Sequence, residues 1–375
     1  MRRRQALGML AAFMASGASA RRLRAGQAGR SWSQFRGDAQ LTGVADSPAP
    51  PLSLLWTEEL GESIESSAAI ADGTVYVGSR TGELVALDLG TGARRWVYAA
   101  GSEIGESSPC VDAGLVYVGD SKGVLHAVGA RDGTPAWSFK TRAEIKASPV
   151  VAEGRLLIGS YDHHVYALDA RTGTLGWKLE TDGPVQATAS VDDGLTYVAG
   201  CDASLRAIQI RDGREAFQVS SGGYTGASAA LGGGHAYYGT FENEVLAVDL
   251  RARRVVWRYT PADRQFPFYS SAALAAGNVV VGGRDRLVHA IDAASGRAVW
   301  TFATRARVDS SPAVAGGRVY VGSGDGRLYA LDLSSGQRIE DFDAGSPINA
   351  SPALAAGRLV IGTNDGQLLC FGREG

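Results

Sequence analysis

The chain has 375 residues and a nearly even charge balance, with 37 Lys and Arg against 39 Asp and Glu. This mild acidic excess, without a basic stripe, excludes a nucleic-acid-binding protein that depends on such a stripe. The three cysteines lie in separate parts of the chain, which excludes a framework of disulfides.

Residues 1–20 predict an export signal. Three Arg precede a short apolar run, rich in Ala and Gly, that ends in the cleavage pattern Ala18-Ser19-Ala20. Arg3 and Arg4 favour the twin-arginine route, and an ordinary signal that begins with Arg is the alternative. No Cys follows the apolar run and no later stretch is long enough to span a membrane. We therefore expect an exported protein, periplasmic or extracellular, without a lipid anchor or a transmembrane segment.

After the signal, we expect residues 21–51 to form a flexible N-terminal segment and residues 52–375 to form one repeat domain. The domain repeats a strand-like run, such as VYVG, that ends in a small residue, and these end residues lie 40 to 43 positions apart: Gly78, Gly119, Gly159, Ala199, Gly239, Gly282, Gly322 and Gly362. Each period holds four short strand-like runs, which is the content of one β-propeller blade. The sequence therefore predicts an all-β fold: an eight-bladed propeller of four-stranded antiparallel blades.

A large aromatic residue recurs eighteen positions after each end residue and predicts a docking contact between blades. The Trp residues in this series are Trp56, Trp96, Trp137, Trp177, Trp257 and Trp300. Phe217 takes the position once, and Glu340 breaks the rule. The eighth period runs out before this position, whereas Trp56 precedes the first period, so we expect the run around Trp56 to complete the last blade and close the ring.

The repeats resemble a known family. The segments ALDLGTGARRW (86–96) and ALDARTGTLGW (167–177) fit the pattern A-x-D-x-x-T-G-x-x-x-W, which resembles the tryptophan-docking motif of pyrroloquinoline-quinone (PQQ)-type propeller repeats. One group in this family comprises quinoprotein dehydrogenases that carry PQQ and Ca²⁺. The other is the BamB group of outer-membrane assembly factors, which are not enzymes, and WSQFRGDAQLTG (32–43) looks like the start of that group. The resemblance specifies the fold more than the function.

One position varies from blade to blade while the residues around it repeat. It precedes a pair of small residues in each innermost run, and it holds Glu65, Glu106, Lys146, Gln186, Gly226, Tyr269, Asp309 and Asn349. Because innermost strands line a propeller channel, we expect these eight residues, the mouth ring, to surround one mouth of the channel. Residues of this kind hold PQQ and Ca²⁺ in the quinoproteins that the chain resembles. The alternative is a mouth that holds only water.

The longest step between repeats adds aromatic residues to the same mouth. Phe266 and Phe268 lie in TPADRQFPFYSS (260–271), and Tyr224 lies in the preceding loop of the same kind. Exposed aromatic residues in a cluster favour a binding face for a partner. The alternative is that they fold down over the channel as a plug.

Two hypotheses about function follow. The first is an exported binding or scaffolding module for a protein or peptide partner in the cell envelope, with no cofactor, no metal and no catalytic residue. The second is a PQQ- and Ca²⁺-dependent dehydrogenase with its site at the mouth ring. We prefer the first, because the chain lacks the adjacent Cys pair of the alcohol dehydrogenase group and lacks long insertions that would enclose a cofactor.

Overall fold

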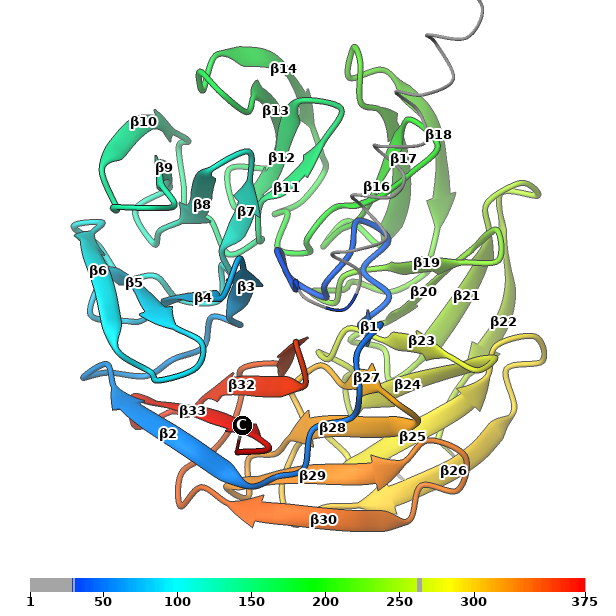
Figure 1. Cartoon of the computed structure of the whole chain (residues 1–375). Coiled ribbons are helices and arrows are strands. Elements are labelled where there is room, and N and C mark those ends of the chain that lie inside the picture. The colour runs from blue at the N-terminus through cyan, green and yellow to red at the C-terminus, as the bar shows by residue number, and fades with distance from the viewer. Residues whose placement is uncertain (1–28, 30, 262–264, 375) are drawn as a thin grey trace, which may run out of the picture.

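The computed structural model describes residues 29, 31–261 and 265–374. It contains eight antiparallel sheets, which surround one axis (Figure 1). Seven sheets have four strands, and one has a fifth strand that pairs in parallel. The predicted all-β, eight-bladed propeller is therefore confirmed. Within the described residues, no helix has the length and apolar character that crossing a bilayer requires.

Strands near the axis are short. In blades one to eight, the innermost strands are β3 (Ala69–Ala71), β7 (Cys110–Asp112), β11 (Val150–Ala152), β15 (Ser190–Asp192), β19 (Ala230–Gly232), β23 (Ala273–Ala275), β27 (Ala313–Ala315) and β31 (Ala353–Ala355). The second strands are β4 (Thr74–Gly78), β8 (Leu115–Gly119), β12 (Arg155–Ser160), β16 (Leu195–Ala199), β20 (His235–Gly239), β24 (Asn278–Gly282), β28 (Arg318–Gly322) and β32 (Arg358–Gly362).

The third and outermost strands of the blades are longer than the innermost strands. The third strands are β5 (Glu83–Asp88), β9 (Val124–Gly129), β13 (His164–Asp169), β17 (Ser204–Gln209), β21 (Val245–Asp249), β25 (Leu287–Asp292), β29 (Arg327–Asp332) and β33 (Gln367–Gly372). The outermost strands are β6 (Arg94–Ala99), β10 (Pro135–Lys140), β14 (Leu175–Glu180), β18 (Glu215–Ser220), β22 (Arg254–Tyr259), β26 (Ala298–Ala303), β30 (Arg338–Asp343) and β2 (Leu54–Glu59).

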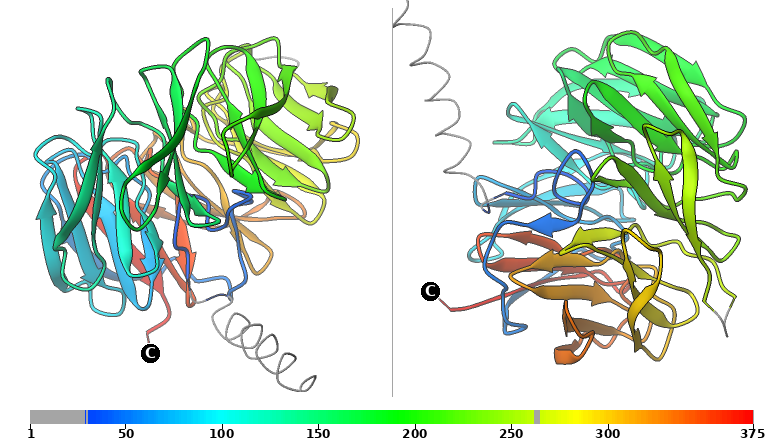
Figure 2. Two further views of the ribbon diagram at one scale, coloured as in Figure 1. Left: turned by 90° about the horizontal axis from the view of Figure 1, so that it is seen from above. Right: turned by 90° about the vertical axis from the view of Figure 1, so that its right-hand side faces the viewer.

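The core lies between neighbouring blades. The second strands read as continuous apolar runs because both of their faces are covered, as in β4, where all five residues are buried. Outermost strands alternate between partly buried and exposed residues, as in β6. Seen from the side, the sheets stand next to one another around the axis (Figure 2). Each apolar cluster is thus shared between blades and holds them together.

Eight hydroxyl groups form a closed belt of hydrogen bonds around the axis. Each belt residue donates its backbone N–H to the side-chain oxygen of the belt residue in the next blade, over 2.9–3.0 Å, and the last bond joins Ser351 to Ser67. The members of this hydroxyl belt are Ser67, Ser108, Ser148, Thr188, Ser228, Ser271, Ser311 and Ser351. The belt satisfies buried N–H groups that no strand pairs at the axis.

Six Trp side chains dock each blade onto the next, as predicted. Each indole N–H donates to a backbone carbonyl in the next blade, over 2.7–3.2 Å: Trp56 to Leu89, Trp96 to Ala130, Trp137 to Ala170, Trp177 to Ile210, Trp257 to Ala293 and Trp300 to Leu333. The ring lies against a turn glycine there. A Cβ on Gly213, for example, would lie 2.6 Å from the Trp177 ring, and its φ of +75° also favours glycine.

The outermost strand of the last blade comes from the N-terminal side of the chain. Strand β2 pairs antiparallel with β33, with Trp56 opposite Cys370, which confirms the predicted closure. It also explains why Glu340 replaces a Trp. No turn connects β33 to β2, so blade seven has no turn glycine ahead of it for an indole to cover. Glu340 instead forms an ion pair with Arg318 of its own blade, over 2.6 Å.

The expectation of a flexible segment over 21–51 is wrong for residues 31–51. Residues 31–45, here called the entry segment, cross the centre of the ring (Figure 1). Trp32 is buried and pairs with Ile70, and β1 (Val44–Ala45) adds to β27 in parallel. Carbonyls of the segment accept N–H bonds from inner strands at Val111, Val191, Leu231, Leu274 and Val314. Free edges of the inner strands therefore anchor it. Residues 1–28, with the predicted signal, lie outside the described residues.

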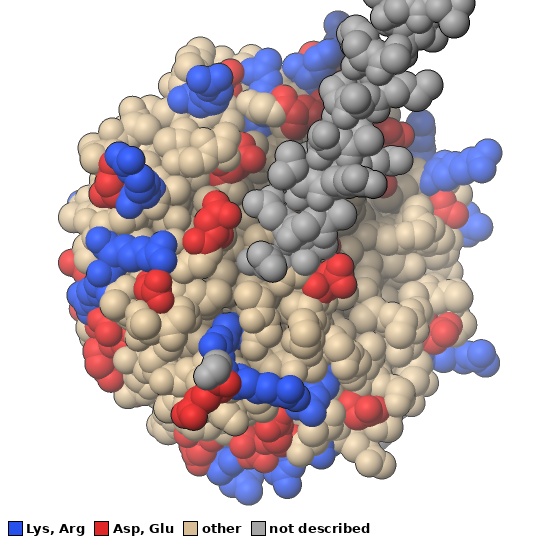
Figure 3. Space-filling view, viewed as in Figure 1, with Lys and Arg blue, Asp and Glu red and all other residues tan. Residues whose placement is uncertain are grey.

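Charged side chains are dispersed over the face shown in Figure 3. Outside the grey atoms, Lys and Arg lie mostly toward the rim, with Asp and Glu close to them. Ion pairs on the outermost strands, such as Arg94 with Glu58 and Arg95 with Asp88, hold charges of opposite sign next to one another. No continuous basic stripe crosses the visible part of this face.

The hydroxyl belt makes a testable contribution to stability. Ser148→Ala removes the acceptor of the Ser108 N–H and leaves a buried donor without a partner, so the free energy of unfolding should fall by about 1–3 kcal/mol. Ser148→Thr keeps the oxygen, and blade four already carries Thr188 in this place, so this control should stay within about 0.5 kcal/mol of the parent. Urea unfolding followed by circular dichroism measures both. Equal losses in the two variants would show that the hydroxyl oxygen does not matter.

The entry segment should stabilise the propeller although it contributes only one short strand. A chain that begins at Ser53 keeps β2 but loses the carbonyl acceptors of several inner strands, each worth roughly 0.5–1.5 kcal/mol. We expect its melting temperature to fall by roughly 10 °C relative to a chain that begins at Ser31. Identical melting curves for the two truncations would contradict a structural role for residues 31–52.

Candidate functional site

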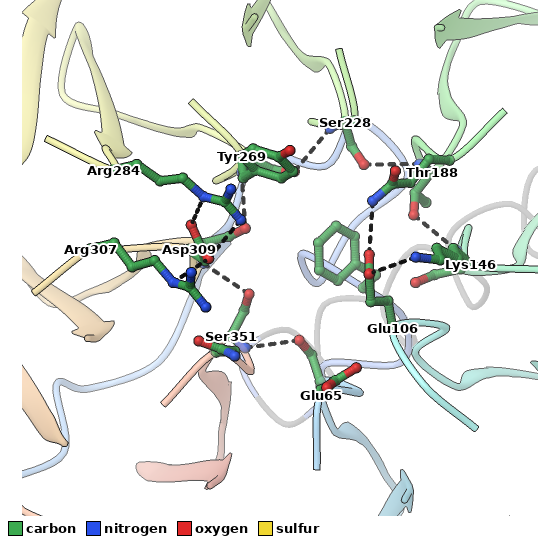
Figure 4. Close-up of a pocket in the computed structure, with 18 residues that line it drawn as sticks. Glu65, Glu106, Lys146, Thr188, Ser228, Tyr269, Arg284, Arg307, Asp309 and Ser351 are labelled. Carbon is green, nitrogen blue, oxygen red and sulfur yellow. Dashed lines mark hydrogen bonds and ion pairs between the residues drawn. The ribbon is translucent and has the colours of Figure 1, made fainter. Parts of the chain in front are cut away.

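A cavity of about 260 Å³ occupies one mouth of the channel. All eight residues of the predicted mouth ring line it, together with seven hydroxyl-belt residues, Phe35, Arg284 and Arg307. Figure 4 shows side chains from opposite blades pointing toward one another across this space, among them Glu65, Glu106 and Asp309. The structure thus brings the ring residues together as the sequence predicted. Whether they bind a ligand stays a prediction.

Packing between blades fixes where the ring side chains point. In most blades an apolar residue precedes the ring residue and inserts against the glycine that ends a neighbouring second strand. A Cβ on Gly322 would lie 2.2 Å from Ile348, the residue before Asn349. Blade four ends its second strand in Ala199, and the facing residue is Thr225 instead of a longer aliphatic side chain. This buried anchor leaves the next side chain to face the axis.

Phe268 occupies one of these anchors, so its predicted role in partner binding is wrong. Its side chain is fully buried, packs edge-on against His289 at 5.4 Å between ring centroids, and lies where Gly239 has no Cβ. Tyr224 and Phe266 are different, because they are 54% and 50% exposed. They belong to the loops that lead from an outermost strand to the next inner strand, on the mouth side. These two residues therefore remain candidates for a binding face.

The acidic residues of the ring are already paired with cations. Glu65 lies 3.2 Å from Arg80, and Glu106 lies 3.4 Å from Lys146 and accepts a bond from Gln186 over 2.9 Å.

Asp309 accepts two hydrogen bonds from Arg284, over 2.8 and 3.0 Å, and lies 3.1 Å from Arg307. Three carboxylates thus face three cations within the cavity lining, and Arg80, which does not line the cavity, adds a fourth cation beside Glu65.

A second ring of residues supports the first, and sequence reasoning missed it. Two positions after each strand-ending residue lie Arg80, Ser121, Tyr161, Cys201, Phe241, Arg284, Gly324 and Asn364. Tyr161 donates to Gln186 over 2.7 Å, Phe241 stacks on Tyr269 at 4.5 Å between centroids, and the Arg284 guanidinium covers the Tyr269 ring at 3.5 Å. This position varies as strongly as the mouth ring does, and that variation was the available signal.

These contacts favour the charged forms of two cations of the mouth, Arg284 and Lys146. Burial alone would lower the pKa of Arg284, but its hydrogen bonds and attraction to Asp309 raise the pKa above the ordinary value. Burial likewise opposes the charge on Lys146, whereas the Glu106 carboxylate raises its pKa. The mouth is therefore a zwitterionic surface with paired charges.

The entry segment closes the cavity from the other end of the inner strands. Phe35 lines the cavity, and its neighbour Arg36 is almost fully buried. The Arg36 guanidinium donates to backbone carbonyls of Ser311, Ala272 and Pro312, and burial lowers its pKa to about 9. Within the part of the chain that the structure describes, the site is thus a bowl with the entry segment at its floor.

Buried His side chains serve the blades and not the cavity. Tyr98 and Asp120 bond the two ring nitrogens of His126, at 3.0 and 3.2 Å, within blades one and two. His289 repeats this arrangement with Tyr259 and Asp285. Neither His lines the mouth cavity.

The donor set does not fit Ca²⁺, which takes six to eight oxygen ligands. Each ring carboxylate is bonded to a cation, and the three come from blades one, two and seven. Within the described ranges, no group of three or more His, Cys, Asp and Glu side chains is placed to hold a metal ion. These residues therefore do not match the Ca²⁺ that accompanies PQQ in the quinoprotein dehydrogenases.

Solved structures of propellers superpose on the chain. BamB from Moraxella catarrhalis shares 17% identity and a TM-score of 0.73, over 86% of this chain and 98% of its own. Quinohemoprotein alcohol dehydrogenase from Comamonas testosteroni shares 15% and 0.79, over 94% and 82%. A europium-containing methanol dehydrogenase shares 15% and 0.78, over 94% and 99%. At these identities the likeness concerns the fold alone.

No curated protein matches the chain. A family model does: the one described as outer membrane protein assembly factor BamB matches residues 53–148, 121–265 and 242–374. These overlapping matches span the propeller from β2 to the end of β33. The chain therefore belongs to the BamB family of PQQ-type propellers.

Proposed function

We propose that the protein is an exported binding or scaffolding module that holds a protein or peptide partner of the cell envelope against its mouth face. Tyr224 and Phe266 carry this proposal, because two aromatic side chains, each about half exposed, stand on the same face as the cavity. Membership in the BamB family supports it, since that family is described by a role in assembling outer membrane proteins.

The charge pattern of the mouth agrees with a docking face. Its charges are paired with one another, so a partner that covers them does not bury any unpaired charge. Among the residues that the structure describes, the side chains that line the bowl form no lid over it. A partner that lies over the rim would instead bury the exposed aromatic rings.

Site-specific cross-linking tests the docking face. A photo-reactive amino acid at Tyr224 or Phe266 should give a discrete adduct with an envelope protein in cells that export the chain. Matched controls at Val97 and Leu175, which are 44% and 41% exposed on outermost strands, should give none. Adducts of the same pattern from all four positions, or none from the mouth positions, would refute the docking face.

A melting experiment tests the dehydrogenase alternative. A ligand that binds the native state at a hundredfold excess over its Kd stabilises it by about 2.7 kcal/mol. We expect Ca²⁺ with PQQ to leave the melting temperature unchanged, because the ring carboxylates are occupied by Arg and Lys. A saturable increase that disappears in Glu106→Ala would overturn the proposal and make the protein an enzyme.

A further inference from the structure

A second cavity, of about 470 Å³, lies beside the mouth cavity. Four arginines line it: Arg284 and Arg286 from the turn between β24 and β25, and Arg305 and Arg307 from the loop between β26 and β27. Asn349 and Asn364 complete its polar wall on the side of blade eight. We call this cavity the arginine groove.

The positive charge of the arginine groove is only partly compensated. Arg284 and Arg307 share Asp309. Arg286 and Arg305 are exposed and form no ion pair with any residue that the structure describes. Among the described residues, no Asp or Glu lines the groove itself. The nearby Asp325 accepts the backbone N–H of Arg305 and the hydroxyl of Tyr329. In a chain with more acidic than basic residues, this local excess of cations points to an anionic ligand.

The groove is continuous with the proposed docking face. It shares Arg284, Arg307 and Asn349 with the mouth cavity. The backbone N–H of Arg284 donates to the carbonyl of Pro267, the residue after Phe266, over 3.3 Å. One ligand can therefore contact the guanidinium groups of the groove and the exposed Phe266 ring together.

We propose that the arginine groove recognises the carboxylates of an acidic, extended segment of the partner, an inference that rests on the proposed function. Guanidinium groups bind carboxylates through paired, charge-assisted hydrogen bonds, and Arg286 and Arg305 have this capacity unused. An open groove over three blades suits an extended chain. An apolar side chain of the same segment meets Phe266. Nucleic acid is a poorer match, because the groove is short and the chain as a whole is acidic.

Fluorescence anisotropy with purified protein tests this assignment. The probe is a short fluorescein-labelled peptide in which Glu alternates with Ser around one central Phe, and its counterpart carries Gln in place of every Glu. We expect the acidic peptide to bind, and Arg286→Gln combined with Arg305→Gln to weaken its binding at least about tenfold. Arg284 and Arg307 are left intact because they hold Asp309.

A matched control removes the same charge from the opposite face. Arg171→Gln combined with Arg251→Gln changes two exposed arginines in the turns before β14 and β22, so it should leave the Kd within about twofold of the parent. Melting curves check that both double variants are folded.

The assignment falls if the parent does not bind the acidic peptide, if the Gln counterpart binds as tightly, or if both double variants weaken binding equally. It also falls if single-stranded DNA displaces the peptide at a lower concentration than unlabelled peptide does, since the groove would then recognise phosphates. Cross-linking from Phe266 separates this failure from failure of the proposed function. If the assignment fails but adducts from Phe266 persist in the Arg286→Gln and Arg305→Gln double variant, the docking face stands and only its preference for acidic segments is refuted.

Discussion

The closed belt of hydroxyl hydrogen bonds is the constraint from which the rest of the molecule follows. The N–H of the residue two positions before each inner strand is bonded by the next blade, and the last of these bonds joins residues 284 positions apart. The eight links have nearly the same length and the same donor and acceptor, so they hold the inner strands in equivalent positions around the axis. The mouth-ring residue, which lies two positions before each belt residue, is then held in an equivalent place in every blade. The eight mouth-ring residues therefore surround one cavity.

At the rim of the propeller, the docking residue of one blade and the residue that faces it in the next blade vary together. An indole needs a glycine opposite it, because any Cβ there would collide with the ring. In blade four the aromatic residue is Phe217, and the facing position holds Arg253, whose guanidinium lies 4.9 Å from the phenyl centroid. A smaller ring leaves room for a side chain, and a cation over its face restores part of the attraction. The two exceptions to the Trp series thus have different causes, one in packing and one in chain closure.

Much of the architecture could be predicted because the same pattern of strand-like runs occurs eight times. One strand-like run is weak evidence, but eight copies about 40 residues apart specify blades, closure and the position of the mouth ring. Features that occur only once in the chain were not predicted correctly. Phe268 was interpreted as exposed because it stands in an aromatic cluster, although it occupies the position of Ile348 in its own blade. The entry segment contains Gly, Ser and Arg, which are typical of a loop, and its order comes from strand edges far away in sequence. A buried Arg36 that bonds only carbonyls has no local signature at all.

Closure through β2 also decides when the molecule can become complete. Strand β33 pairs with residues 54–59, and the final link of the belt joins Ser351 to Ser67, so the ring closes only after the last repeat has been synthesised. Until then β2 has no strand partner, and the face of blade seven that packs against blade eight is uncovered, so both are sites for mispairing with other chains. A premature stop in the last repeat would therefore leave an unpaired β2 at one end and an uncovered seventh blade at the other.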